Sequence, residues 1–269
     1  MLTRRDGWTR IVEVNPPDLP DMTHLLLDGT WPHVLVTDNV FGKIRVSPYA
    51  YAARITHDVP EVQPTVVVST RDRNILAIES EVRGALGNGV DSFLVVIGDT
   101  MPHVDHLAHH YEIVEHLRRL QAPPLPEFEV GMPTRFQRWQ FRQRVDRGAQ
   151  FLVAGPVLDP ATVEPNMARL ALEAGDPPVF LMVIPPFGAE WVQRVETMGA
   201  VPTAPGFVER LEAVPEASRR RHAWDLARET EELARAAGCA GVILMGLTFD
   251  TVVDEAAAAW REHSARPPA

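Results

Sequence analysis

The chain has 269 residues, a formal net charge of -10 and one cysteine, Cys239. The acidic balance disfavours binding to a phosphate backbone, and a single cysteine excludes both an internal disulfide and a cysteine-rich metal site. No apolar run approaches the roughly 18 residues of a membrane span, and no apolar region follows the basic start "MLTRRDGWTR" as in a signal peptide. We therefore expect a cytoplasmic protein without a nucleic-acid or membrane partner.

Eight apolar, β-rich segments follow one another along the chain, at residues 10–17, 33–39, 64–70, 92–100, 127–133, 150–156, 178–186 and 241–248. Helical periodicity lies between most of them, at residues 73–88, 105–120, 135–148, 161–174, 189–198, 217–238 and 252–263. This alternation predicts an α/β fold, a single (β/α)8 TIM barrel over residues 1–269 with a frayed tail at 265–269. A doubly wound open sheet is the main alternative, but no GxGxxG follows the first strand.

Three Pro-rich stretches interrupt the alternation. Residues 16–60 are Pro-rich and leave little room for a full helix between the first two strands. The Pro-rich joints at 122–126 and 202–205 are predicted to be loops.

Polar residues gather where the apolar segments end, which in a TIM barrel is the face that carries the chemistry. They are Glu13, Asn15, Thr37, Asp38, Asn39, Ser69, Thr70, Arg71, Asp72, Asp99, Thr100, Glu129, Gly155, Asp159, Thr248 and Asp250. Carboxylates dominate this predicted mouth, and no His or Cys triad accompanies them.

Glu13 is the most unusual of these residues, because it stands inside the apolar segment "IVEVNPP". A carboxyl group in such surroundings tends to have a raised pKa and can hold a proton near neutrality, which suits a general acid. The structural alternative is a Glu that pairs with an arginine from a neighbouring strand end, such as Arg71.

Other polar clusters have both structural and functional interpretations. Asp99 could cap the segment after the fourth strand or face a ligand, and Asp72 could cap the helix that follows "TRDRN". His106 and His110 have the i, i+4 spacing of zinc ligands, but there is no HExxH, so we predict no metal site. Arg219, Arg220 and Arg221 are predicted to be a solvated helix face.

The ordered pieces "VEVNPP" (12–17), "TRDRNILAIESEVRGALGNGV" (70–90), "FLVVIGD" (93–99) and "RVDRGAQFLVAGPVLD" (144–159) resemble the methylenetetrahydrofolate reductase family over about residues 10–185. That family has a (β/α)8 fold and reduces 5,10-methylenetetrahydrofolate to 5-methyltetrahydrofolate, a step of one-carbon metabolism that serves methionine biosynthesis. The resemblance implies that Glu13 donates a proton to the folate and that Asp99 binds the pterin. It also implies a cofactor site at Thr37, Asp38, Ser69, Arg71, Asp72, Gly98, Arg144 and Gly155.

Several positions depart from the family pattern. Ala154 and Gly155 replace a Thr-Gln pair, Val67 replaces a His and Ile97 replaces an Arg. Most of these changes remove flavin contacts. The resemblance implies NADH or NADPH as hydride donor, and the departures predict that FAD binds weakly or not at all.

Three hypotheses follow from the sequence. The first is a methylenetetrahydrofolate reductase, with or without flavin. The second is a barrel enzyme that acts on another folate or a different small acceptor, and the third is a non-catalytic subunit of a partner reductase. The sequence leaves open whether the chain forms a homo-oligomer and whether it uses NADH or NADPH.

Overall fold

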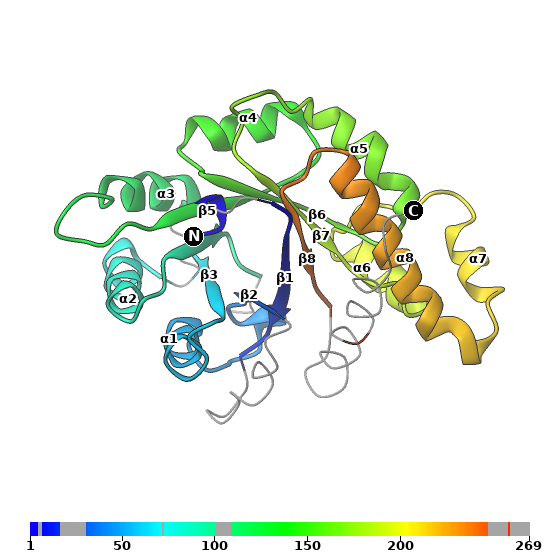
Figure 1. Cartoon of the computed structure of the whole chain (residues 1–269), viewed down its shortest axis with the longest axis horizontal. Coiled ribbons are helices and arrows are strands. Elements are labelled where there is room, and N and C mark those ends of the chain that lie inside the picture. Colours follow the sequence, from blue (N-terminus) through cyan, green and yellow to red (C-terminus); the bar gives the residue numbers. More distant parts are fainter. Residues whose placement is uncertain (5–6, 17–30, 72, 100–108, 247–257, 259–269) are drawn as a thin grey trace.

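The computed structural model describes residues 1–4, 7–16, 31–71, 73–99, 109–246 and 258. Eight parallel strands form a closed barrel in chain order, with helices outside the ring (Figure 1). The strands are β1 (Thr9–Val14), β2 (His33–Val36), β3 (Gln63–Ser69), β4 (Ser92–Val96), β5 (Glu129–Thr134), β6 (Phe151–Val157), β7 (Val179–Val183) and β8 (Gly241–Leu244). The first strand pairs with the last, and the predicted TIM barrel is therefore confirmed.

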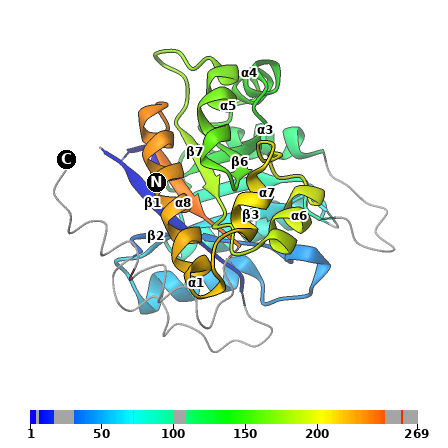
Figure 2. The same ribbon diagram turned by 90° about the vertical axis from the view of Figure 1, so that its right-hand side faces the viewer.

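The α-helices of the described residues are α1 (Pro48–Asp58), α2 (Ile75–Gly87), α3 (His110–Arg119), α4 (Arg138–Asp146), α5 (Val163–Leu170), α6 (Ala189–Thr197), α7 (Phe207–Glu212) and α8 (Glu216–Ala236). Short 3-10 helices cover Leu2–Arg4, Val40–Gly42 and Pro160–Thr162. Helices α5 and α8 run side by side along one side of the barrel (Figure 2). None of the helices in the described ranges is long and apolar enough to cross a membrane.

The barrel interior is a packed core, because alternate residues of each strand point inward. The inward cluster comprises Leu2, Ile11, Leu35, Val67, Leu94, Phe151, Val153, Phe180 and Ile243. The other set of strand residues packs outward against the helices. Since Ile11 points inward, Glu13, Thr37 and Ser69 follow the same alternation and open on the carboxyl end of the barrel.

Glu129 does not lie at this mouth, so its predicted position is wrong. It is the first residue of β5 and is fully buried at the opposite end of the barrel. Its carboxylate accepts hydrogen bonds from the backbone N–H of Leu2 and Thr3, and from the hydroxyl groups of Thr3 (2.7 Å) and Ser92 (2.9 Å). Glu129 thus holds the N-terminal segment across the floor of the barrel.

Most predicted elements are present with shorter bounds, but two helices were not predicted. Helix α1 begins with Ser47 and Pro48 within the irregular region 16–60, and α7 follows the predicted loop at 202–205. The exposed face of α8 carries Arg219, Arg220 and Arg221, as predicted. The predicted helix at 252–263 and the tail at 265–269 lie outside the described residues, apart from Ala258.

Candidate active site at the barrel mouth

Glu13 is the central ionisable group of the mouth. It is partly exposed, with its side chain directed into the top layer of the barrel. Burial of the carboxyl group raises its pKa from 4.5 to about 7, the backbone N–H of Gly246 lowers it by donating a hydrogen bond, and the charge of Asp99 raises it. No arginine forms an ion pair with Glu13 in the described part of the chain, so the structural alternative of a pair with Arg71 is wrong.

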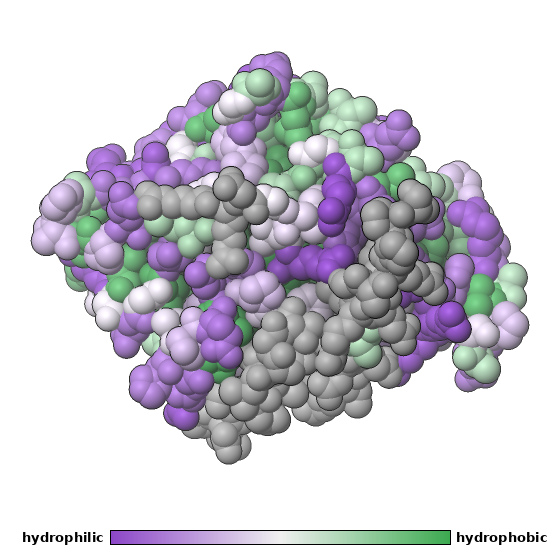
Figure 3. All heavy atoms as spheres, in the orientation of Figure 1, coloured by the Kyte–Doolittle hydropathy of each residue, from purple (hydrophilic) through white to green (hydrophobic). Residues whose placement is uncertain are grey.

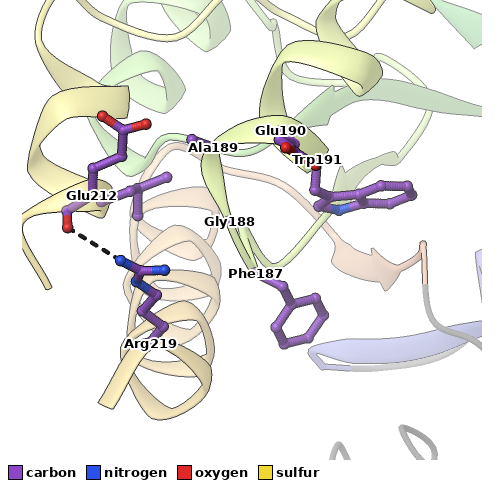
Figure 4. Close-up of a pocket in the computed structure, with 8 residues that line it drawn as sticks. Phe187, Gly188, Ala189, Glu190, Trp191, Glu212 and Arg219 are labelled. Carbon is purple, nitrogen blue, oxygen red and sulfur yellow. Dashed lines mark hydrogen bonds between the residues drawn. The ribbon is translucent and has the colours of Figure 1, made fainter. Parts of the chain in front are cut away.

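Gly246 lies next to two side chains, Ile184 directly after β7 and Trp191 on α6. Its φ of 77° lies in the left-handed region, and an added Cβ would lie 3.1 Å from Cζ2 of Trp191 and 3.2 Å from Cγ2 of Ile184. The indole of Trp191 extends from the start of α6 toward the end of β8 (Figure 4). These neighbours leave little room for a side chain at the residue whose backbone donates to Glu13.

Trp191 also borders a cavity of about 590 Å³ between α6, α7 and α8. The cavity wall includes Phe187, Glu190, Glu212 and Arg219 (Figure 4). The guanidinium of Arg219 donates hydrogen bonds to the backbone carbonyl oxygens of Val214 and Glu212, at 3.0 and 3.4 Å. The cavity therefore adjoins the mouth through Trp191, but its arginine serves the α7–α8 connection.

Thr37 and Asp38, both predicted cofactor residues, bind other parts of the protein. The Thr37 hydroxyl lies 2.6 Å from the side-chain oxygen of Asn15. The buried carboxylate of Asp38 forms an ion pair with Arg73, which also lies 3.3 Å from Glu81 and over the ring of Tyr49. Asp38 therefore ties the end of β2 to the start of α2.

Ser69, Arg71 and Gly98 form a cluster where β3 and β4 end. The Arg71 guanidinium donates to the carbonyl oxygen of Gly98 from Nε and one Nη, both at 3.4 Å. Gly98 has a φ of 88°, and an added Cβ would lie 2.0 Å from Oγ of Ser69. Ser69 thus occupies the space that a side chain at position 98 would need.

Asp99 follows Gly98 and is exposed at the mouth, where its charge acts on Glu13. Asp72 lies outside the described residues. The cap of α2 is Asn74, whose side chain accepts from the N–H of Ala77 at 2.9 Å, so the interpretation of Asp72 as that cap is wrong.

Gly155 lies at the mouth end of β6, at an irregularity in the pairing with β7. Its φ is 119°, and an added Cβ would lie 2.9 Å from the carbonyl oxygen of Met182. Asp159 caps the following 3-10 helix and accepts from the N–H of Ala204 at 2.8 Å. Both residues shape the backbone near the mouth.

Arg144 is on α4, outside the strands, and contacts none of the predicted mouth residues that the structure describes. It donates to the carbonyl oxygens of Pro133 and Gln140, and it lies over the ring of Tyr111. The predicted cofactor residues are therefore divided between the mouth and the α3–α4 side of the barrel.

The histidines form no metal site within the described ranges. His109 and His110 stack with ring centroids 5.1 Å apart, and burial, followed by the nearby His109 and Arg144, lowers the pKa of His110 to about 4. His106 lies outside the described residues, so the i, i+4 pair is not tested.

Sequence reasoning missed Gly246, Trp191 and Arg73. Gly246 could have been found, since it follows the last apolar strand in "VILMG". Arg73 was present in "TRDRN", but no sequence signal pairs it with an acid 35 residues away. Trp191 had no signal that distinguished a wall of the mouth from ordinary packing.

No protein-family profile and no curated protein sequence matches the chain. Solved structures share the fold. A crystal structure of 2,3-dimethylmalate lyase, from the PEP mutase/isocitrate lyase superfamily, has a TM-score of 0.54 at 14% identity, over 97% of this chain and 80% of that one. Oxaloacetate acetylhydrolase with 3,3-difluorooxalacetate gives 0.54 at 12% identity, over 97% and 82%, and EDTA monooxygenase from Chelativorans sp. BNC1 gives 0.54 at 13%, over 97% and 95%.

These comparisons correct the family resemblance read from the sequence. The chain is similar to the barrels of a lyase and an acetylhydrolase, and the findings contradict both membership of the methylenetetrahydrofolate reductase family and the folate reduction that it implied. They also contradict the folate substrate and the place in methionine biosynthesis. The use of NADH or NADPH, the weak or absent binding of FAD and the homo-oligomer remain predictions that the structure does not test. At 12–14% identity, the likeness identifies the fold: a (β/α)8 TIM barrel.

Proposed function

We propose that this chain is a TIM-barrel enzyme of the lyase type, in which Glu13 transfers a proton at a small organic acid bound in the mouth. The observation that carries the proposal is the carboxyl group of Glu13, directed into the mouth with a pKa of about 7. Such a group exists in both protonation states near neutral pH and can act as base and then as acid in one cycle.

The names of two similar barrels support the choice of reaction. They are a lyase for 2,3-dimethylmalate and an acetylhydrolase for oxaloacetate, both acting on small dicarboxylic acids. Nothing in the described structure favours a non-catalytic subunit over an enzyme.

The chemistry can be written for a hydroxy acid. The ionised Glu13 takes the hydroxyl proton, the hydroxyl oxygen becomes a carbonyl oxygen, and the adjacent carbon–carbon bond breaks. The electron pair of that bond stays on the carbon next to the acid group. Protonated Glu13 then returns its proton to that carbon, so the carboxylate is regenerated and the atoms balance.

The test is a cleavage assay on malate, 2-methylmalate and 2,3-dimethylmalate, with products followed by proton NMR. We expect cleavage of at least one acid by the wild-type chain, and a loss of roughly 100-fold or more in Glu13→Gln. The control is Glu61→Gln, which removes an exposed carboxylate from the turn before β3 and should leave the rate unchanged. Equal rates in Glu13→Gln and the wild type would overturn the proposal.

A further inference from the structure

We infer that Arg71, with Ser69 beneath it, is the subsite that binds the carboxylate group of the substrate. This inference rests on the proposed function, because it assigns the acid group of the same small molecule. It starts from the charge balance of the mouth, where a cation is placed among acids on a chain of net charge -10.

Arg71 is partly buried, yet no carboxylate lies within ion-pair distance of it in the described chain. Its guanidinium donates two hydrogen bonds of 3.4 Å to the Gly98 carbonyl oxygen, beyond the usual range of about 2.7–3.2 Å. A guanidinium has five N–H donors in a flat fork that matches a carboxylate, so most of its donor capacity remains for a ligand.

Other partly buried arginines of the described structure have carboxylate partners or shorter hydrogen bonds to carbonyl groups. Arg10 pairs with Glu231 at 2.7 Å, Arg73 pairs with Asp38, and Arg138 pairs with Asp176 at 3.1 Å. Arg144 lacks a carboxylate but donates to two backbone carbonyl groups, one of them at 3.0 Å. The guanidinium of Arg71 thus differs from these arginines in making only long hydrogen bonds to one carbonyl oxygen.

Ser69 supplies a second donor at the same place. Its hydroxyl contacts the carbonyl oxygen of Ile97 at 3.5 Å and accepts from the N–H of Arg71 at 3.4 Å, both long. An added Cβ at Gly98 would lie 2.0 Å from Oγ of Ser69 and 3.3 Å from Cβ of Arg71, so the missing side chain leaves these two residues side by side. The pair can therefore bind one carboxylate together, with the guanidinium as the main contact.

The subsite lies on the same face of the barrel as Glu13. Arg71 follows the end of β3, Glu13 is near the end of β1, and only β2 separates the two strands. The negative charge of a bound acid group would also balance the guanidinium of Arg71, which has no carboxylate partner among the described residues.

The experiment is calorimetric titration of the wild-type chain with oxalate and, separately, with inorganic phosphate. We expect oxalate to bind, Arg71→Gln to weaken it at least tenfold, and Arg71→Lys to restore part of the affinity. Arg221→Gln removes the same charge from the exposed face of α8 and should bind oxalate like the wild type. Circular dichroism would confirm that each variant is folded.

No oxalate binding to the wild type, or equal affinity in Arg71→Gln, would overturn the subsite. Binding of phosphate alone would overturn its assignment to a carboxylate. The measurement is separate from turnover, because Glu13→Gln keeps Arg71 and should still bind oxalate. If oxalate binding depends on Arg71 but no acid is cleaved, the subsite stands and the proposed reaction fails.

Discussion

The backbone N–H of Gly246 donates a hydrogen bond to the carboxyl group of Glu13, and joins the end of β8 to the end of β1. This bond favours the ionised carboxylate, whereas burial, the larger cause, favours the protonated acid. The balance leaves the pKa near 7, and the proposed chemistry depends on that balance.

A substitution at Gly246 should therefore change the acidity of Glu13. Gly246→Ala strains a φ of 77° and brings the Cβ to 3.1 Å from Cζ2 of Trp191, so we expect the backbone to relax and the hydrogen bond from its N–H to weaken. We expect the pKa of Glu13 to rise above 7. The pKa of Glu13 can be measured from the infrared band of the protonated carboxyl group between pH 5 and 9, with the spectrum of Glu13→Gln subtracted. A pKa that is the same in Gly246→Ala and the wild type would contradict the role of Gly246.

The raised pKa of Glu13 also predicts how stability depends on pH. The folded state holds the proton up to about pH 7 and the unfolded state loses it near 4.5, so stability falls as the pH rises through this window. The loss relative to Glu13→Gln is at most about 3 kcal/mol. Urea unfolding of both proteins at pH 4, 6 and 8 measures it, and parallel pH curves would contradict the raised pKa.

Gly98 is predicted to be intolerant of any side chain. Gly98→Ala must adopt a φ of 88°, which costs about 1–2 kcal/mol, and must also displace the Ser69 hydroxyl. The control is Gly84→Ala in α2, where the added Cβ meets open space and should stabilise the helix by about 0.5–1 kcal/mol. Denaturant unfolding compares them, and equal effects of the two changes would contradict the packing at position 98.

The buried Asp38–Arg73 pair is predicted to support the mouth structurally. Asp38→Asn leaves Arg73 without its main partner and should cost about 3–5 kcal/mol, as for other broken buried pairs. The exposed pair of Arg147 and Glu115 serves as a control and should contribute much less. A double-mutant cycle with Arg73→Met measures the coupling free energy between the two side chains. A coupling of zero would contradict the structural role of the pair and favour a role of Asp38 in ligand binding.

Much of the barrel could be predicted from the sequence, because strands buried on both faces read as apolar runs and the helices between them are amphipathic. Glu13 could be recognised for the same reason, as a carboxylate inside such a run. Helix α1 was missed because Ile55 is the one large aliphatic residue of its buried face, which otherwise holds Pro48, Tyr49, Tyr51 and Ala52, although Ser47-Pro48 is a normal helix start.

The errors have physical causes. Glu129 was placed at the mouth because an apolar pattern does not show at which residue a strand starts, and here it starts at the acid itself. Asp38 was assigned to a cofactor because its partner, Arg73, is distant in the sequence. The family resemblance depended on short motifs, and these also arise where strand ends need Gly, Asp or Pro for backbone reasons.

The central claim is that Glu13 moves a proton at a carbon next to an acid group. Exchange of the C2 protons of propionate with solvent deuterium, with pyruvate present as the carbonyl partner and followed by proton NMR in D₂O at pD 7, tests this step without requiring the full substrate. We predict exchange with the wild-type chain above the protein-free rate, and exchange at that background rate with Glu13→Gln. Background exchange with the wild type, or equal exchange with both proteins, would contradict the account.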